Sequence, residues 1–395
     1  MRIKHIGFCL LITFSSLLNA CGKAEDSELK YEHIINTDGS QTRVEKPTID
    51  ASIKGGAEIS ILPSEWMDYY NDLSDYENIK YYYMAGVENT KPRIPTTRWT
   101  GEEGSYLYEI LLSTNKMMEN PVVYETCDNY LKLVDLYAGT HYYYQIKAKF
   151  ADKIVLSKRF DFKTVDFFRT LDIDGVLNAR DLGNKKTADG KKRIKQGLVY
   201  RCASFDSVTA LGKGQALENY GIKTDLDLRE QGPTSSPLGP DVNYVNNGVG
   251  IYGSPMYVSY DTGVNADEYH ETMKKNLLMF ANMDNLPLAF HCAVGRDRTG
   301  TLAITLELLL GIDLEQVKQD YVVTFFSKVC ETASFNSLNT QMNGLIGYYN
   351  FYDNDDWTNS KSLYSSVEKY CMDIGLTKAD INSIRNNLLE DVPKE

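Results

Sequence analysis

The sequence has few histidines and no closely spaced cysteine pairs. Its 395 residues include five His and seven Cys, and neither a Cys-x2-Cys pair nor a His/Cys cluster occurs. Zinc sites are built from such clusters. We therefore expect no metal site, and nothing in the sequence calls for another cofactor.

Positive charge is also scarce. The chain has 42 Lys and Arg against 54 Asp and Glu, for a formal net charge of -12. Nucleic acids and anionic membrane surfaces attract basic proteins. The balance argues against a nucleic-acid partner and against tight electrostatic docking on a membrane, although a local basic pocket is compatible with it.

Long apolar runs are absent after the N-terminus. The first run, 6–18, follows the positive residues Arg2 and Lys4 and is too short to span a bilayer. A positive start, a short apolar core and small residues are typical of a signal peptide. We expect residues 1–20 to be one, and the protein to be exported.

The end of this segment resembles a bacterial lipobox. Leu18-Asn19-Ala20-Cys21 would make Cys21 the lipid-bearing first residue of the mature chain. The expectation is a lipid-anchored protein of the bacterial cell envelope, with residues 21–47 as a polar tether. The N-terminal lipid would be its only membrane contact. A plain signal peptide cut after Ala20 is the alternative.

Short β-rich runs separated by turn residues fill residues 48–165. This spacing predicts a small all-β sandwich domain. The runs 136–148 and 160–164 resemble the last strands of a fibronectin type III domain, which carry a corner like Gly139-Thr140-His141-Tyr142. Residues 64–80 are polar and aromatic, and we interpret them as an insertion.

Strand-like and helical segments alternate over residues 166–395. Such alternation predicts an α/β domain with a mainly parallel sheet and helices on both faces. Residues 231–263 are rich in Gly, Pro and Ser and predict a long loop. The helices are expected at 209–220, 268–283, 301–310, 361–374 and 378–390.

One stretch of this domain carries reactive groups: His291-Cys292-Ala293-Val294-Gly295-Arg296-Asp297-Arg298-Thr299-Gly300. It joins the apolar run 286–290 to the helix closed by Gly311. Backbone N–H groups and the helix dipole favour an anion at such a helix start, and the same field favours a thiolate on Cys292. Arg298 can hold two oxygens of a phosphate. The alternative is a structural Cys beside a surface Arg.

This stretch resembles the Cys-x5-Arg loop of cysteine-dependent phosphatases. Together with Asn178-Ala179-Arg180-Asp181-Leu182-Gly183, Val199-Tyr200-Arg201 and Asp227-Leu228-Arg229, it resembles bacterial tyrosine phosphatases, whose family overlaps dual-specificity and phosphoinositide phosphatases. The resemblance implies hydrolysis through a cysteinyl-phosphate, with Cys292 as nucleophile and His291 and Thr299 in support. Arg296 stands where Lys is usual. The phosphate-binding residues implied are Ala293, Val294, Gly295, Arg296, Asp297 and Arg298.

The general acid is ambiguous. Many relatives take it from an upstream Trp-Pro-Asp, which this sequence lacks. Asp297 is favoured because it matches an Asp found inside the loop of some relatives. Asp261, in the upstream Gly-rich segment, is the competitor. A third interpretation leaves Asp297 as a mere ion-pair partner of a neighbouring Arg.

These features predict an exported phosphatase that hydrolyses phosphomonoesters. A phosphotyrosine protein or peptide is the preferred substrate, and a phosphoinositide or inositol phosphate is the alternative. A different class of function also stays open, namely a surface binding module with an inert phosphatase domain. The intact set of Cys292, Asp297, Arg298 and Thr299 argues against the latter.

Overall fold

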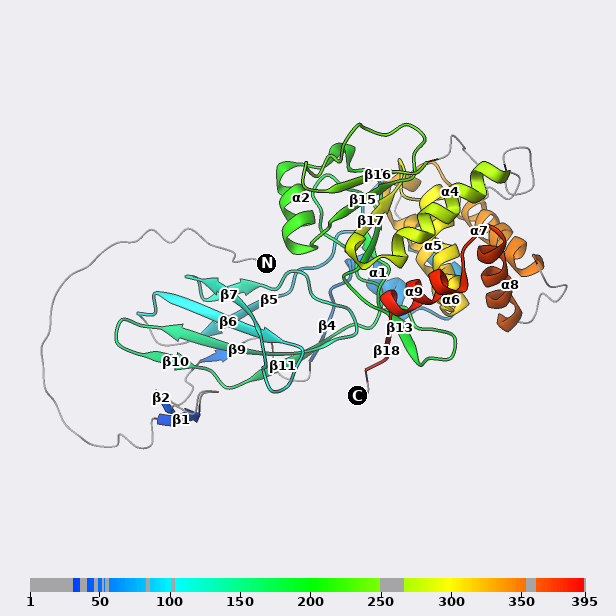
Figure 1. Cartoon of the computed structure of the whole chain (residues 1–395). Coiled ribbons are helices and arrows are strands. Elements are labelled where there is room, and N and C mark those ends of the chain that lie inside the picture. The colour runs from blue at the N-terminus through cyan, green and yellow to red at the C-terminus, as the bar shows by residue number, and fades with distance from the viewer. Residues whose placement is uncertain are drawn as a thin grey trace, which may run out of the picture. The chain divides into compact units, whose positions relative to one another are not determined.

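A computed structural model describes residues 31–35, 41–45, 49–51, 53, 57–82, 86–100, 104–248, 266–352 and 360–393 (Figure 1). The predicted signal peptide, Cys21 and Asp261 lie outside these residues. No helix in the described ranges is long and apolar enough to cross a membrane. The chain divides into two compact units, which comprise residues 1–60 with 94–165 and residues 61–93 with 166–395.

The described residues of the first unit form strands and no helix. A three-stranded sheet has the order β3-β5-β8, and a larger sheet contains the path β1-β2-β10-β9-β11-β4 with β6 and β7 added through β9. The strands are β1 Tyr31–Ile35, β2 Gln41–Glu45, β3 Asp50–Ala51, β4 Ala57–Ile59, β5 Thr96–Thr100, β6 Leu107–Ser113, β7 Val122–Thr126, β8 Tyr130–Lys132, β9 His141–Lys149, β10 Ile154–Leu156 and β11 Phe160–Thr164.

Buried aromatic residues occupy the interior of this unit. Trp99 of β5 meets Tyr108 of β6 edge to face, with ring centroids 5.2 Å apart, so side chains of the two sheets touch. Along β9 every second residue is buried, as expected for a strand with one face on a core. Tyr142 is the second residue of this strand, and its hydroxyl accepts a hydrogen bond from the Tyr137 N–H at 2.7 Å. A Tyr hydroxyl bonded to the backbone a few residues upstream is also the arrangement found in the tyrosine corner of some β-sandwiches.

Two parts of the expected layout need correction. Strands β1 and β2 pair antiparallel inside the range 21–47, which was expected to be only a tether. Their aromatic and β-branched residues suit extended backbone. The continuous boundary 48–165 is also wrong, because residues 61–93 belong to the second unit. We call residues 61–93 the arm.

The second unit is built on a five-stranded sheet of order β12-β14-β17-β15-β16. All neighbouring strands are parallel except β12, which is antiparallel to β14. The mainly parallel α/β arrangement predicted from the sequence is therefore confirmed for this unit. The strands are β12 Arg180–Asp181, β14 Val199–Cys202, β15 Thr224–Asp227, β16 Asn243–Asn246 and β17 Leu288–His291, and β13 Lys192–Ile194 pairs separately with β18 Leu389–Asp391. The range 231–263 thus contains strand β16, where only a loop was expected.

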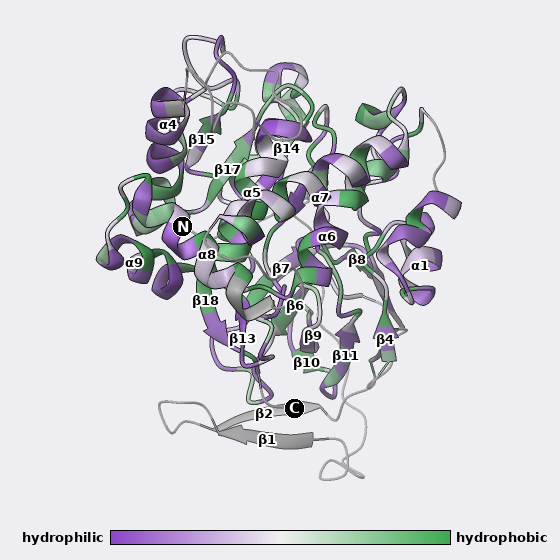
Figure 2. Ribbon diagram, turned by 90° about the vertical axis from the view of Figure 1, so that its right-hand side faces the viewer, coloured by the Kyte–Doolittle hydropathy of each residue, from purple (hydrophilic) through white to green (hydrophobic). Residues whose placement is uncertain are grey.

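Helices cover both faces of this sheet (Figure 1). On one face lies α2 with the helical turn after it, whose Ala216 and Tyr220 join a buried cluster with Tyr200 and Ala289. The other face carries α5, nearly all of which is buried. Figure 2 shows β17 in the green of hydrophobic residues and the outer helix α4 largely in purple. The helices are α1 Ser64–Asn71, α2 Ala210–Gly214, α4 Ala266–Leu278, α5 Asp297–Leu309, α6 Leu314–Val322, α7 Phe335–Phe351, α8 Ser360–Asp373 and α9 Lys378–Leu388.

Candidate active site

Residues 292–298, which we call the Cys–Arg loop, connect the end of β17 to the start of α5. The strand end is fixed by a hydrogen bond of 2.8 Å from the Leu228 N–H to the His291 carbonyl. The helix begins with the bond from the Gly300 N–H to the Arg296 carbonyl, at 2.7 Å. The N–H groups of the first helical turn have no partner further back in the helix, so they face the loop and favour negative charge there.

Cys292 lies at the base of the loop and is 2% exposed. Burial of the thiol opposes its ionisation, yet the pKa of Cys292 is lowered from its ordinary value. The hydroxyl and N–H of Thr299, the charge of Arg298 and the Val294 N–H all favour the thiolate. The Thr299 hydroxyl has no other hydrogen-bond acceptor among the described residues, so it remains available to the sulfur. The site therefore favours a nucleophilic sulfur.

Gly295 forms the tightest bend of the loop. Its φ of 67° lies in the left-handed region, and an added Cβ would stand 2.2 Å from the Cys202 carbonyl oxygen. Its own carbonyl accepts hydrogen bonds from Arg201 Nη2 at 3.0 Å and from Asn178 Nδ2 at 3.1 Å. Because these donors hold the carbonyl on the outside of the bend, the N–H groups of the loop are left to face an anion.

A buried charge cluster supports the loop from behind. Asp320 accepts from Arg180 Nε at 3.0 Å and from Arg201 Nη1 at 2.6 Å, and Lys185 lies 3.2 Å from it. Burial alone would raise the pKa of Asp320, but these three cations hold it well below its usual range. Glu307 lies 3.0 Å from Lys185, and burial raises its pKa. Since each of these side chains is at most 1% exposed, the cluster is structural and does not reach solvent.

His291, the last residue of β17, is held in place by contacts with neighbouring segments. Its Nε2 lies 2.8 Å from Asp225 Oδ1, and its ring stands edge to face against Phe205 at 5.1 Å. Burial works against protonation, yet the pKa of His291 is raised because Asp225 and Asp227 both favour the imidazolium. The supporting role expected for this residue stays a prediction.

The two charged residues after Gly295 pair with each other. Arg296 Nε and Nη2 lie 3.0 and 3.2 Å from the two carboxylate oxygens of Asp297. The side chains are partly exposed, at 22% and 29%. The ion pair weighed in the sequence is therefore present, and Asp297 must leave it before it can give a proton to a leaving group.

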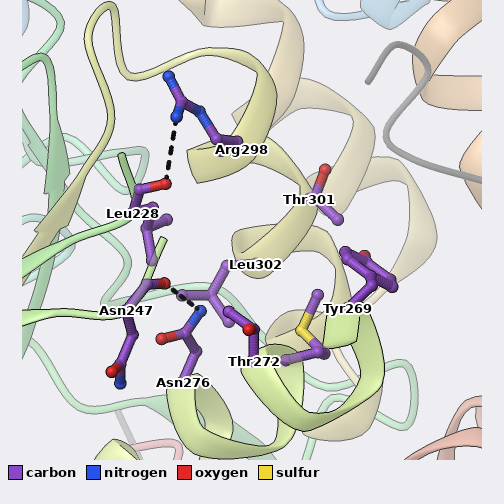
Figure 3. A pocket seen from close by; sticks show the side chains of 9 residues that line it. Leu228, Asn247, Tyr269, Thr272, Asn276, Arg298, Thr301 and Leu302 are labelled. Carbon is purple, nitrogen blue, oxygen red and sulfur yellow. Dashed lines mark hydrogen bonds between the residues drawn. The ribbon is translucent and has the colours of Figure 1, made fainter. Parts of the chain in front are cut away.

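Arg298 directs its guanidinium toward the residue that follows β15 by one position. Its Nη1 donates to the Leu228 carbonyl at 3.3 Å, as Figure 3 shows. Beside it lies a small pocket of about 30 Å³, large enough for one or two waters. The pocket is lined by Leu228, Asn247, Tyr269, Thr272, Met273, Asn276, Arg298, Thr301 and Leu302.

The region 171–390, more than half of the chain, matches the tyrosine phosphatase family. The chain belongs to this family. Membership in the tyrosine phosphatase family agrees with the Cys–Arg loop just described.

Curated relatives of this tyrosine phosphatase family member cover only part of it. A protein of Cupriavidus necator that is named as a tyrosine-protein phosphatase is 25% identical over 38% of this chain and 62% of its own length. Proteins named as the tyrosine-protein phosphatase OCA1 in Debaryomyces hansenii and Scheffersomyces stipitis are each 35% identical over 27% of this chain and 54% of their own. The matched part of this chain thus spans a little over half the length of these relatives.

Two solved structures of the Siw14 catalytic core also align with the chain. One, described as the core catalytic domain of the PP-IP phosphatase from S. cerevisiae with citrate, has a TM-score of 0.27 and 19% identity over 44% of this chain and 88% of its own. The other has a TM-score of 0.25 and 15% identity over 37% and 88%. Similarity of this degree does not by itself establish a shared structure.

Sequence reasoning placed the loop residues of this family member together but missed most of their supports. Of the loop, Ala293 is exposed, Gly295 is buried, and Val294, Arg296, Asp297 and Arg298 are partly buried. Lys185 and Glu307 carried no signal for the site, because lone charged residues far apart in sequence resemble solvated ones. Among the described residues, no group of three or more His, Cys, Asp or Glu side chains is placed to hold a metal ion.

Proposed function

We propose that this protein hydrolyses phosphomonoesters through a cysteinyl-phosphate intermediate. The observation that carries the proposal is the thiol of Cys292, whose pKa is lowered, despite its burial, by Thr299 and by the charge of Arg298. The thiolate attacks phosphorus and forms the S–P bond while the bond to the ester oxygen breaks. Arg298 and the N–H groups of the loop hold the three equatorial oxygens, where negative charge spreads in the transition state.

The departing oxygen needs a proton, and the second step needs a base. In this proposal one carboxyl group performs both tasks: it protonates the leaving alcohol or phenol, then takes a proton from the water that attacks the phosphoenzyme. The products are the alcohol and inorganic phosphate, and Cys292 returns as a thiolate that Thr299 stabilises. Asp297 is the first candidate, once released from Arg296. Asp261 remains the competitor.

The substrate that we propose first is a phosphotyrosine protein or peptide, with a phosphoinositide or inositol phosphate as the alternative. Family membership and the names of the curated relatives support the first. A phosphate-release panel of phosphotyrosine peptides, phosphoserine peptides, phosphoinositides and soluble inositol phosphates would rank them. A chain that releases phosphate from none of these, nor from an aryl phosphate, would instead be an inert binding module.

The covalent step has a direct test. After rapid acid quench during turnover of an aryl phosphate, the wild-type protein should carry a phosphoryl group on Cys292, detectable by peptide mass spectrometry. Cys292→Ser should fold as the wild type does and carry none. Turnover of the serine variant near the wild-type rate would reject Cys292 as the nucleophile.

Export and lipid anchoring are part of the same proposal. The short apolar core 6–18 and the lipobox-like Leu18-Asn19-Ala20-Cys21 support them. Mass spectrometry of the mature N-terminus, after expression in a bacterium that processes lipoproteins, should find diacylglycerol on Cys21. An unmodified N-terminus at residue 21 or later would contradict it.

We further propose that the first unit is a fibronectin type III-like sandwich. The tyrosine corner at Tyr142 and the contact between its two sheets support this. A fragment prepared to solve the structure of this unit should include strand β4, because β4 pairs with β11. A solved structure with a different strand connectivity would reject the assignment.

A further inference from the structure

The arm is part of the second unit, although 72 residues of the first unit separate it from residue 166. Its helix α1 buries Trp66 and Tyr69 completely. The Trp66 ring stacks on Phe326 at 5.3 Å, and the Tyr69 ring meets Phe326 at 5.9 Å. This aromatic contact fixes one end of the arm on the segment that follows α6. The arm lies outside residues 171–390, the part matched by the family.

A second group of contacts fixes the middle of the arm. The Tyr76 hydroxyl donates to Asn339 Oδ1 at 2.8 Å, and the Tyr76 N–H donates to Glu315 at 3.2 Å. Glu77 accepts from Asn339 Nδ2 at 3.0 Å. These contacts tie the arm to α6 and α7, and none of them involves the Cys–Arg loop.

The far end of the arm reaches the support of the Cys–Arg loop through Glu88. One oxygen of its carboxylate accepts from the Asn178 N–H at 3.0 Å and from the Thr90 hydroxyl. The other accepts from the Ser327 hydroxyl at 2.6 Å and from the Lys328 N–H at 2.9 Å. One side chain thus joins three segments that are distant in sequence.

Asn178 links Glu88 to the Cys–Arg loop through hydrogen bonds. It is completely buried and has a φ of 55°, in the left-handed region. Its Nδ2 donates to the carbonyls of Gly295 at 3.1 Å and Val294 at 3.4 Å, while its Oδ1 accepts from Arg180 Nη1 at 2.6 Å. Both carbonyls must point outward for the loop N–H groups to face an anion, so the orientation of Asn178 affects the geometry of the anion site.

We propose that Glu88 is a positioning residue for the Cys–Arg loop, and that the arm completes the catalytic unit. Glu88 touches neither Cys292 nor Arg298. It acts by holding the backbone of Asn178 in its left-handed conformation, which sets the outward carbonyls of Val294 and Gly295. The inference rests on the proposed phosphatase function for its kinetic consequence, but its structural consequence concerns the anion site alone.

The test uses the full chain and three variants. Glu88→Ala removes the acceptors for Asn178, Ser327 and Lys328. Glu88→Gln can keep an oxygen facing Asn178 while placing an amide group toward Ser327 and Lys328. Glu77→Ala is the matched control, because it removes a glutamate of the same arm that contacts Asn339 and not Asn178. Each protein is measured for thermal unfolding, aryl-phosphate kinetics, inorganic phosphate affinity and the pH midpoint of Cys292 ionisation.

Glu88→Ala should lower kcat by about 10- to 100-fold, the range expected when a reacting group is misplaced by an ångström or less. It should also weaken inorganic phosphate binding and raise the pH midpoint of Cys292. Glu88→Gln should restore part of the kcat and of the phosphate affinity, and should return the pH midpoint of Cys292 part of the way to the wild-type value. Glu77→Ala should lower the unfolding temperature and leave the pH midpoint in place.

If Glu88→Ala changes only the unfolding temperature, as expected for Glu77→Ala, the arm is merely structural and the inference is overturned. Phosphate affinity and thiol ionisation need no turnover. A wild-type protein that hydrolyses nothing would therefore defeat the proposed function and still leave these two measurements to judge Glu88.

Discussion

Asp297 and Arg296 form a bidentate ion pair within the Cys–Arg loop, in which Arg296 Nε and Nη2 lie 3.0 and 3.2 Å from the two carboxylate oxygens of Asp297. The pair leaves the charge of the Asp297 carboxylate already matched by Arg296. A substrate phosphate would compete for Arg296 and release the carboxylate. Catalysis by Asp297 therefore requires that substrate binding break this pair.

Asp297→Asn should harm poor leaving groups most. Alkoxides and the phenolate of tyrosine are basic leaving groups, so their departure needs a proton in the transition state. The p-nitrophenolate group is much less basic and leaves readily without one. General acid catalysis contributes about 10²–10⁴-fold, so a loss in that range is expected on phosphotyrosine or inositol phosphates. A much smaller loss is expected on p-nitrophenyl phosphate.

Asp261→Asn is the matched control for this prediction, because Asp261 is the competing candidate. Steady-state kcat/KM for both substrate types should be compared in the two variants. If the loss that depends on the leaving group follows Asp261 instead, the acid comes from the upstream segment. Asp297 would then serve only as the partner of Arg296.

Thr299→Ala should raise the pH at which Cys292 ionises. The folded protein lowers the pKa of Cys292, so its thiolate forms below the ordinary value of 9.0. A hydrogen bond to a charged group contributes about 1.5–3 kcal/mol, which corresponds to a rise of about one to two pH units when it is lost. The measurement is the ultraviolet absorbance of the thiolate against pH, with Cys292→Ser subtracted as the blank. An unchanged midpoint would show that the hydroxyl does not stabilise the sulfur.

Asp320→Asn should destabilise the protein by about 3–5 kcal/mol, the usual cost of removing one partner from a buried ion pair. The substitution leaves Arg180, Arg201 and Lys185 buried near one another with less compensating charge. Asp391→Asn is the control, because that residue pairs with Lys192 while 88% exposed and should change stability little. Urea unfolding of both variants checks the difference. Equal effects would show that the cluster does not depend on the charge of Asp320.

The pair of His291 and Asp225 should make stability fall as pH rises. The pKa of His291 is raised above 6.5 in the folded protein, so the imidazolium stabilises the fold fully below about pH 6.5. This contribution is lost as pH rises through the folded-state pKa, with a slope of at most about 1.4 kcal/mol per pH unit. In Asp225→Asn the histidine lacks its partner, and the slope should flatten. Denaturant unfolding from about pH 5 to 8 and above checks it, and an identical slope in both proteins would contradict the assignment.

Local sequence was sufficient for the core of the candidate site and for little beyond it. The apolar run before Cys292 and the helix closed by Gly311 are short-range patterns, so β17 and α5 could be predicted. Strand β16 was not predicted because its sequence, Asn-Tyr-Val-Asn, lies among turn residues that dominate the pattern of the segment. The contact between Arg180 and Asp320 joins residues far apart in sequence, and no periodicity reports such a contact.

The arm shows why domain boundaries were harder to predict. Trp66 and Tyr69 are aromatic, and aromatic residues are as common in β cores as in helices that pack on an α/β domain. The sequence indicated only an insertion at residues 64–80 within the range 48–165, whereas the contacts of Trp66 and Tyr69 with Phe167 and Phe326 assign them to the second unit. The fibronectin type III resemblance, the lipid on Cys21 and the role of Asp261 stay predictions.

The arm also affects how the protein is made. The ribosome releases Trp66 roughly 260 residues before Phe326, which is tens of seconds at a synthesis rate of about 5–20 residues per second. The first unit can fold once residue 165 has emerged. At that time Phe326, on which Trp66 and Tyr69 of α1 pack, has not yet been synthesised. We therefore expect the nascent chain to expose α1 for most of its synthesis, and to need a chaperone or a temporary cover there until the C-terminal half arrives.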